Sequence, residues 1–177
     1  KNGIKPMKAV NAVLGFVINF LRSVPFIILL VAIIPFTRFL VGTSLGSTAT
    51  IVPLVVSAAP FIARMVESSI KEVDGGVIEA AQSMGASPFE IVMKVLLPEA
   101  KPSLIVGSAI AVTTILGYSA MAGFVGGGGL GTIGINYGYY RYQNDIMLVT
   151  VVLLVIIVQL LQEIGMFVAK RTDKRIK

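Results

Sequence analysis

One serine in this sequence has the spacing of a hydrolase nucleophile. The segment Gly42-Thr43-Ser44-Leu45-Gly46 matches the G-x-S-x-G pattern, in which a sharp turn presents the serine hydroxyl. Such a serine needs a neighbouring base, usually histidine, and the chain contains no histidine. A lysine base is remote too, since no lysine lies between Lys8 and Lys71. The pattern therefore predicts a turn, and we expect no catalytic residue in the chain.

A second pattern, formed by Gly126, Gly128 and Gly131, has the glycine spacing of dinucleotide-binding loops. Those loops follow a β-strand, whereas this one follows a long apolar segment. The sequence also lacks the G-K-[ST] element of ATP-binding phosphate loops. Because cysteine is absent as well as histidine, the usual transition-metal ligands are missing. We therefore expect no cofactor and no metal on this chain, and we expect the glycines to turn it.

Composition places these residues in a lipid bilayer. Hydrophobic residues make up 55% of the chain and charged residues 14%, with a mean hydropathy of +0.88; soluble domains average about 25% charged residues. A membrane-spanning helix needs about 20 apolar residues. Apolar stretches of that length predict four spans, over residues 13–40, 47–69, 103–125 and 146–169. The predicted fold is an all-α, polytopic membrane helical bundle that forms a single domain over residues 1–177.

The basic residues orient these spans, because lysine and arginine collect in cytoplasmic loops. With both ends of the chain in the cytoplasm, only Arg38 and Arg141 of the 15 basic residues fall outside. This arrangement predicts a cytoplasmic loop over residues 71–102 and an outer loop over residues 126–145. Basic residues do not gather in one patch with aromatics, so we expect no nucleic acid. The chain starts with Lys1 instead of methionine, and we expect it to begin inside a longer protein.

The loop over residues 71–102 is predicted to form two short amphipathic helices. Asp74 can cap the first helix, and Gly85 suits the left-handed residue that ends it. Its predicted apolar side comprises Val77, Ile78, Ala81 and Met84. Ser87-Pro88-Phe89-Glu90 is a capping box that begins the second helix. The predicted stripe of that helix comprises Phe89, Val92, Met93 and Leu96, up to Pro98.

The same loop is net acidic, although cytoplasmic loops usually favour positive charge. Its basic residues are Lys71, Lys94 and Lys101, and its acidic residues are Glu72, Asp74, Glu79, Glu90 and Glu99. An acidic loop is a poor partner for anionic lipid, so its charge favours a protein partner.

The spacing of this loop resembles the EAA loop of permease subunits of ATP-binding-cassette (ABC) importers. The matching elements are Glu79-Ala80-Ala81, then Gly85 after three residues, and Val95-Leu96-Leu97-Pro98 after nine more. The family has isoleucine where Val95 stands. Other segments are similar to the methionine-importer permeases: Phe20 to Phe26, Ile51 to Leu54, Ala59 to Arg64 and Gly117 to Met121. Those permeases have five spans, so the resemblance implies that the first span is missing here.

The resemblance implies a bacterial cytoplasmic (inner) membrane protein that is not itself an enzyme. It implies a permease homodimer, two cytoplasmic ATPase subunits that hold ATP and Mg, and an external substrate-binding (lipo)protein. An amino acid, most of all methionine, would cross by alternating access. The carboxyl terminus would be cytoplasmic. The residues that the resemblance implies for contact with the ATPase are Glu79, Ala80, Ala81, Met84, Gly85, Ser87 and Pro98.

Candidate residues for the substrate path are Pro60, Tyr118, Ser119 and Met121. Small and polar residues around Tyr118 interrupt an apolar span, as in helices that line a transport path. Close helix packing on small residues explains this pattern equally well, so both interpretations stay open. The polarizable sulfur of Met121 would suit a thioether. Near the end of the second span, Arg64 and Glu67 have the spacing of an ion pair.

Three alternatives to a methionine permease remain at this point. The chain could be a permease for another amino acid or small solute. A membrane-embedded enzyme is disfavoured because Ser44 has no catalytic partners. A passive channel or structural scaffold is disfavoured by the presence of the acidic two-helix loop.

Overall fold

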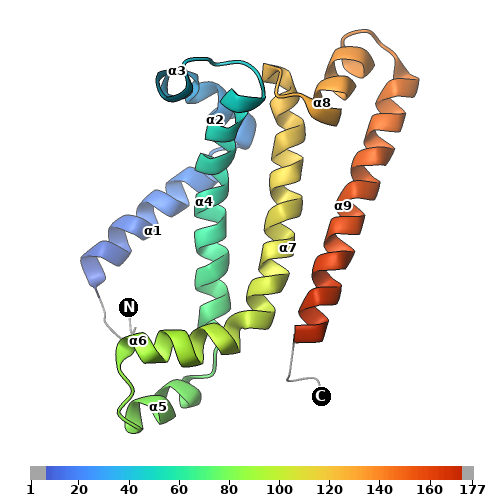
Figure 1. Ribbon diagram of the computed structural model, residues 1–177. Helices are drawn as coiled ribbons and strands as arrows, with labels where there is room; N and C mark the ends of the chain where they lie inside the picture. Colours follow the sequence, from blue (N-terminus) through green and yellow to red (C-terminus); the bar gives the residue numbers. More distant parts are fainter. Residues whose placement is uncertain (1–6, 173–177) are drawn as a thin grey trace.

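The computed structural model describes residues 7–172, and three long helices form its body. They are α4 (Ser47–Lys71), α7 (Leu97–Met121) and α9 (Asn144–Thr172). Each is long and apolar enough to cross a membrane, and they include the predicted spans 47–69, 103–125 (except its last four residues) and 146–169. Helix α7 lies between α4 and α9 and packs against both (Figure 1). Large apolar side chains such as Val151, Val155 and Leu160 face outward, as contact with lipid requires.

The predicted first span, residues 13–40, is not one helix. It is divided among α1 (Lys8–Ser23), α2 (Phe26–Ala32) and α3 (Ile34–Val41), and α2 is bent by 102° from α1. The break falls at Val24, which is extended (φ −87°, ψ 123°) because the following Pro25 disfavours a helical conformation there. By length and composition, α1 and α2 together can still form one bent span. In contrast, α4 continues through Pro53 and Pro60 without ending.

The turn predicted around Ser44 is confirmed. Helix α3 ends at Gly42 (φ 80°), and α4 begins after Gly46 (φ 94°). The hydroxyl of Thr43 accepts the N–H of Leu45 at 3.3 Å. Two left-handed glycines and this local hydrogen bond account for the G-x-S-x-G spacing.

The second helix of the loop was predicted to be short, with its stripe running up to Pro98, but it continues past Pro98 into a membrane-length helix. Helix α6 (Pro88–Glu90), the π-helical η1 (Ile91–Leu96), α7 and the 3₁₀ turn η2 (Ala122–Val125) form one helical run of 38 residues. In the π turn the N–H of Leu97 bonds to the carbonyl of Val92, five residues back. The usual four-residue pattern is thus already interrupted where Pro98 has no N–H to donate. The first part of the run crosses the base of the structure below α4 and then turns up into α7 (Figure 1).

After η2 the chain turns at Gly126 (φ 71°) and folds back on the bundle. Helix α8 (Gly129–Ile133) and the π-helical η3 (Gly134–Tyr139) pack against α7 and α9 at the end opposite α5 (Gly75–Ser83) (Figure 1). The backbones touch: a Cβ atom at Gly123 would lie 2.6 Å from the carbonyl carbon of Gly131. A Cβ atom at Gly131 would collide with the carbonyl oxygen of Ala120. These glycines are therefore required by close approach of two backbones.

Candidate functional site

Helix α5 is defined at both ends by the residues predicted to cap it. The Asp74 carboxylate accepts the N–H of Gly76 at 2.6 Å. At the other end Gly85 adopts φ 79°, and its N–H donates to the carbonyl of Gln82 at 2.9 Å. The N–H of Ala86 donates to the carbonyl of Ala81 at 3.1 Å. This pair of bonds is a Schellman motif, so the predicted start and end of the helix are confirmed.

The capping box at Ser87 is confirmed as well. Its hydroxyl accepts the N–H of Glu90 at 3.3 Å, and its own N–H donates to the Glu90 carboxylate at 3.1 Å. Lys94 donates to the other carboxylate oxygen at 3.0 Å. The bond from Lys94 and those from Ser87 lower the pKa of Glu90 to about 2. Two well-defined caps thus fix the chain on both sides of Gly85.

A small apolar cluster ties α5 to the start of the long helical run. Its buried members are Val73, Ala81, Ile91, Leu96 and Ala100, and Ile78 packs against it. The predicted stripe of the second helix is wrong except for Leu96, because α5 covers the side that carries Ile91, which is 1% exposed. Phe89 and Met93 face outward instead, with 73% and 49% exposure. The loop therefore has its own core, which packs α5 against the start of α7.

The outer side of this loop carries exposed apolar side chains. Met84 is 81% exposed, Phe89 73% and Val77 41%. An apolar group exposed on an otherwise polar loop is typical of a protein contact. Among the predicted ATPase-contact residues, Glu79, Ala80, Met84, Gly85, Ser87 and Pro98 are exposed. Ala81 is 4% exposed and supports the loop from inside; the exposure of Phe89 was not predicted, since its spacing indicated the packed side.

The predicted path residues do not share one cavity. Tyr118 stacks on Phe26 of α2, with ring centroids 4.8 Å apart. Ser119 instead lines a cavity of about 140 Å³ between α7, α8 and α9. Adjacent residues on a helix point in different directions, so Tyr118 and Ser119 face different neighbours. Met121 is 46% exposed and Pro60 is buried in α4.

An ion pair on α4 was predicted and is present. Arg64 donates to the Glu67 carboxylate at 2.6 Å, and Lys71 donates to its other oxygen at 2.6 Å. The guanidinium of Arg64 also donates to the side-chain oxygen of Asn19 at 2.6 Å, which links α4 to α1. This link was missed because nothing in the sequence pairs residues so far apart.

Within residues 7–172 no group of three or more histidine, cysteine, aspartate or glutamate side chains could hold a metal ion. The features that distinguish this structure are the capped loop at one end and the glycine-rich segment at the other. Both are connected to the ends of membrane-length helices.

Comparison with known proteins assigns the chain to a family. Residues 3–177 match the family described as "Binding-protein-dependent transport system inner membrane component". The "Probable D-methionine transport system permease protein MetI" of Vibrio cholerae is 53% identical over 175 residues, which cover 99% of this chain and 78% of that protein. The "Methionine import system permease protein MetP" of Bacillus subtilis is 45% identical over 175 residues, or 99% of this chain and 79% of that protein.

A solved structure has the same fold. It is described as "Inward facing conformations of the MetNI methionine ABC transporter" and matches with a TM-score of 0.92 and 52% identity, over 97% of this chain and 79% of the solved chain. The all-α fold predicted from the sequence is thereby confirmed. The chain belongs to the family of binding-protein-dependent transport system inner membrane components.

Proposed function

We propose that this chain is the membrane permease subunit of an ABC importer for methionine. The observation that carries the proposal is the capped loop with its exposed apolar side, on a chain 53% identical to a D-methionine transport permease. Its length and its apolar helices suit a transport subunit, and ATP hydrolysis belongs to a separate ATPase that holds ATP and Mg.

The proposed contact with the ATPase is made by the exposed side of α5 and the adjoining residues. Met84 and Phe89 supply exposed apolar anchors, and methionine and phenylalanine are residue types enriched in the buried cores of protein interfaces. Glu79 lies exposed on α5 and supplies charge. Because Ala81 and Ile91 belong to one buried cluster, a displacement of α5 is passed to the helical run that becomes α7.

The remaining assembly follows from the same proposal. Two permeases form a homodimer in the bacterial inner membrane, two ATPases bind on the cytoplasmic side, and an external binding (lipo)protein delivers the amino acid. The carboxyl terminus that follows α9 lies in the cytoplasm. Tyr118, Ser119, Met121 and Pro60 remain the candidates for the substrate path.

Uptake into proteoliposomes tests this function. The permease is reconstituted with the ATPase and the binding protein, and labelled methionine is supplied outside with ATP inside. We expect ATP-dependent accumulation that unlabelled methionine blocks and that leucine and glutamine leave unchanged. Equal competition by leucine would contradict methionine as the substrate, and uptake without ATP would contradict the importer mechanism.

Copurification separates the importer from a channel or scaffold. We expect the ATPase to accompany the intact permease through affinity purification in mild detergent. A permease that is folded but consistently free of ATPase would rule out the coupling role of α5.

A further inference from the structure

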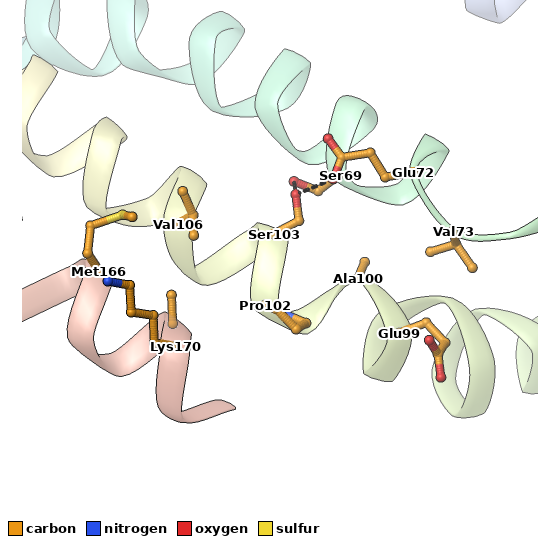
Figure 2. Close-up of a pocket in the computed structure, with 11 residues that line it drawn as sticks. Ser69, Glu72, Val73, Glu99, Ala100, Pro102, Ser103, Val106, Met166 and Lys170 are labelled. Carbon is orange, nitrogen blue, oxygen red and sulfur yellow. Dashed lines mark hydrogen bonds between the residues drawn. The ribbon is translucent and has the colours of Figure 1, made fainter. Parts of the chain in front are cut away.

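A cavity of about 320 Å³ lies at the end of the bundle that carries α5. It opens where the last turns of α4 and α9 flank the start of α7 (Figure 2). Its size is at the lower end of the range for small-molecule pockets, about 300–1,000 Å³. The cavity is separate from the exposed side of α5 and from the predicted path residues.

One wall of the cavity carries an ordered carboxylate. The hydroxyl of Ser103 lies 2.7 Å from the carboxylate of Glu72 and 3.0 Å from the hydroxyl of Ser69. A hydroxyl has one hydrogen, so Ser103 gives it to the carboxylate and accepts the hydrogen of Ser69. Ser69 is 3% exposed, so this chain of bonds begins at a buried hydroxyl and ends at the exposed carboxylate of Glu72. The carboxylate of Glu72 has further lone pairs, so it can accept N–H donors from a ligand.

The opposite wall comes from α9 and is of opposite charge. Lys170 lies there beside Met166, across the cavity from Glu72 and Ser103 (Figure 2). The lining thus combines the Glu72 carboxylate on one wall with a lysine on the other. This combination favours a zwitterion, whose ammonium faces Glu72 and whose anion faces Lys170.

The location favours a lipid as the source of that zwitterion. The lining residues come from the ends of membrane-length helices, where the head groups of a bilayer lie. Val106 and Met166 form an apolar part of the lining. They lie farther along α7 and α9 toward the middle of these helices, where acyl chains would continue.

We propose that this cavity binds a primary ammonium zwitterion, the head group of phosphatidylethanolamine in the adjacent leaflet. Its ammonium donates to Glu72, and its phosphate pairs with Lys170. A bound head group would join α4, α7 and α9 beside the α5 loop. Phosphatidylcholine fits less well, because a quaternary ammonium has no N–H to donate. The site does not depend on which solute is imported.

Native mass spectrometry of the intact transporter tests the proposal. The delipidated complex is incubated with equal amounts of phosphatidylethanolamine and phosphatidylcholine of matched acyl chains. We expect retention of phosphatidylethanolamine to be about tenfold stronger, the factor for one charge-assisted hydrogen bond. Glu72→Gln should abolish this preference. Glu163→Gln, on an exposed position of α9 outside the cavity, should keep it.

Other variants and ligands keep the test decisive. Ser103→Ala removes the bond that orients Glu72 and should reduce the preference severalfold, so a poorly folded Glu72→Gln does not end the experiment. Equal retention of the two lipids by the unmodified complex would overturn the proposal. If free methionine or phosphoethanolamine binds at millimolar concentration while phosphatidylethanolamine does not, the cavity is an ammonium site, and the proposal that its ligand is a lipid is overturned. Retention is measured without ATP or transport, so its failure leaves the proposed import function unaffected.

Discussion

Phe26 on α2 and Tyr118 on α7 stack face to face, with ring planes 6° from parallel and centroids 4.8 Å apart. Phe26 is the first residue of α2, directly after the break at Val24 and Pro25. Together with Leu30 and Ala122 it forms a buried cluster, and Tyr118 packs against that cluster. The stack therefore fixes the position of the broken helix relative to α7.

Removing the ring of Tyr118 should loosen this contact. Lipid tails are as apolar as Phe26, so the stack contributes through packing and not through removal from water. We expect Tyr118→Ala to lower the free energy of unfolding by about 1 kcal/mol, and Tyr118→Phe to change it little. Thermal unfolding in detergent measures both variants. Equal loss in the two would show that the hydroxyl matters and not the ring.

The contact of α8 with α7 predicts a sharp difference between two glycines. Gly131→Ala places a methyl group against the Ala120 carbonyl and should destabilise the protein by about 1–3 kcal/mol. Gly117→Ala on α7 is the matched control, because nothing lies within 4 Å of a Cβ atom there and its φ is not positive. Thermal unfolding compares them, and a Gly131→Ala protein as stable as Gly117→Ala would contradict the close approach.

The left-handed conformation of Gly85 predicts a defect in coupling. With φ 79° and open space around it, Gly85 tolerates a larger side chain only at a backbone cost of about 1–2 kcal/mol. We expect Gly85→Val to displace α5 and reduce ATP-driven uptake, while the isolated ATPase stays active. Gly75→Ala, with an ordinary φ and open space, serves as the control. Normal uptake in Gly85→Val would show that coupling tolerates a misplaced α5.

The exposed side chain of Met84 is expected to contribute to ATPase binding. A charge on this exposed apolar anchor should weaken the contact severalfold, and Met84→Glu should lose ATPase during copurification. As the control, Gln82→Glu adds the same charge at an exposed position of α5, two residues before Met84. Equal loss in both variants would mean that net charge, and not the apolar anchor, decides the binding.

Removal of the Ser87 cap is expected to change hydrogen exchange locally. Ser87→Ala removes a helix cap and should cost about 1 kcal/mol locally, so the amide of Glu90 should exchange about fivefold faster. The effect should be confined to the segment after Gly85. Uniform acceleration through α7 would indicate that the box supports the whole run.

The Glu90 carboxylate gives this box a defined pH range. The pKa of Glu90 is lowered to about 2. The bonds that its charged carboxylate makes therefore stabilise the capping box fully above the ordinary pKa of 4.5, and this stabilisation is lost as the pH falls through about 2. Amide exchange at Ser87 should accordingly show no loss of protection between pH 7 and pH 5, after correction for intrinsic rates. Early loss in that range would contradict the bonds from Lys94 and Ser87.

Local signals predicted the ends of helices well and the direction of side chains poorly. Asp74, Gly85 and Ser87 form hydrogen bonds or turns with neighbours within a few residues, so their capping roles could be predicted from the sequence. The outward position of Phe89 depends on α5 covering the other side, which is a tertiary contact. Counting apolar residues likewise predicted one span over residues 13–40 and could not detect that Pro25 breaks it while Pro53 and Pro60 do not end α4.

Hydrogen bonds between residues on different helices could not be predicted from the sequence. Asn19 bonds to Arg64, and Ser103 bonds to Glu72, although nothing in either pair's local pattern marks its partner. A single sequence supplies no information on which of several polar residues on neighbouring helices will meet.

The glycine contacts between α7 and α8 limit how this molecule can change shape. With the backbone of Gly131 on α8 packed against Ala120 of α7 and Gly123 of η2, α8 cannot slide along α7, and the two must travel as one rigid body. A change of angle is then left to places outside this contact, and the break at Val24 is one of them. That break adjoins the Phe26–Tyr118 stack, so the rigid body has a joint at this end, whereas the buried cluster that ties α5 to α7 spans the π turn at the other end.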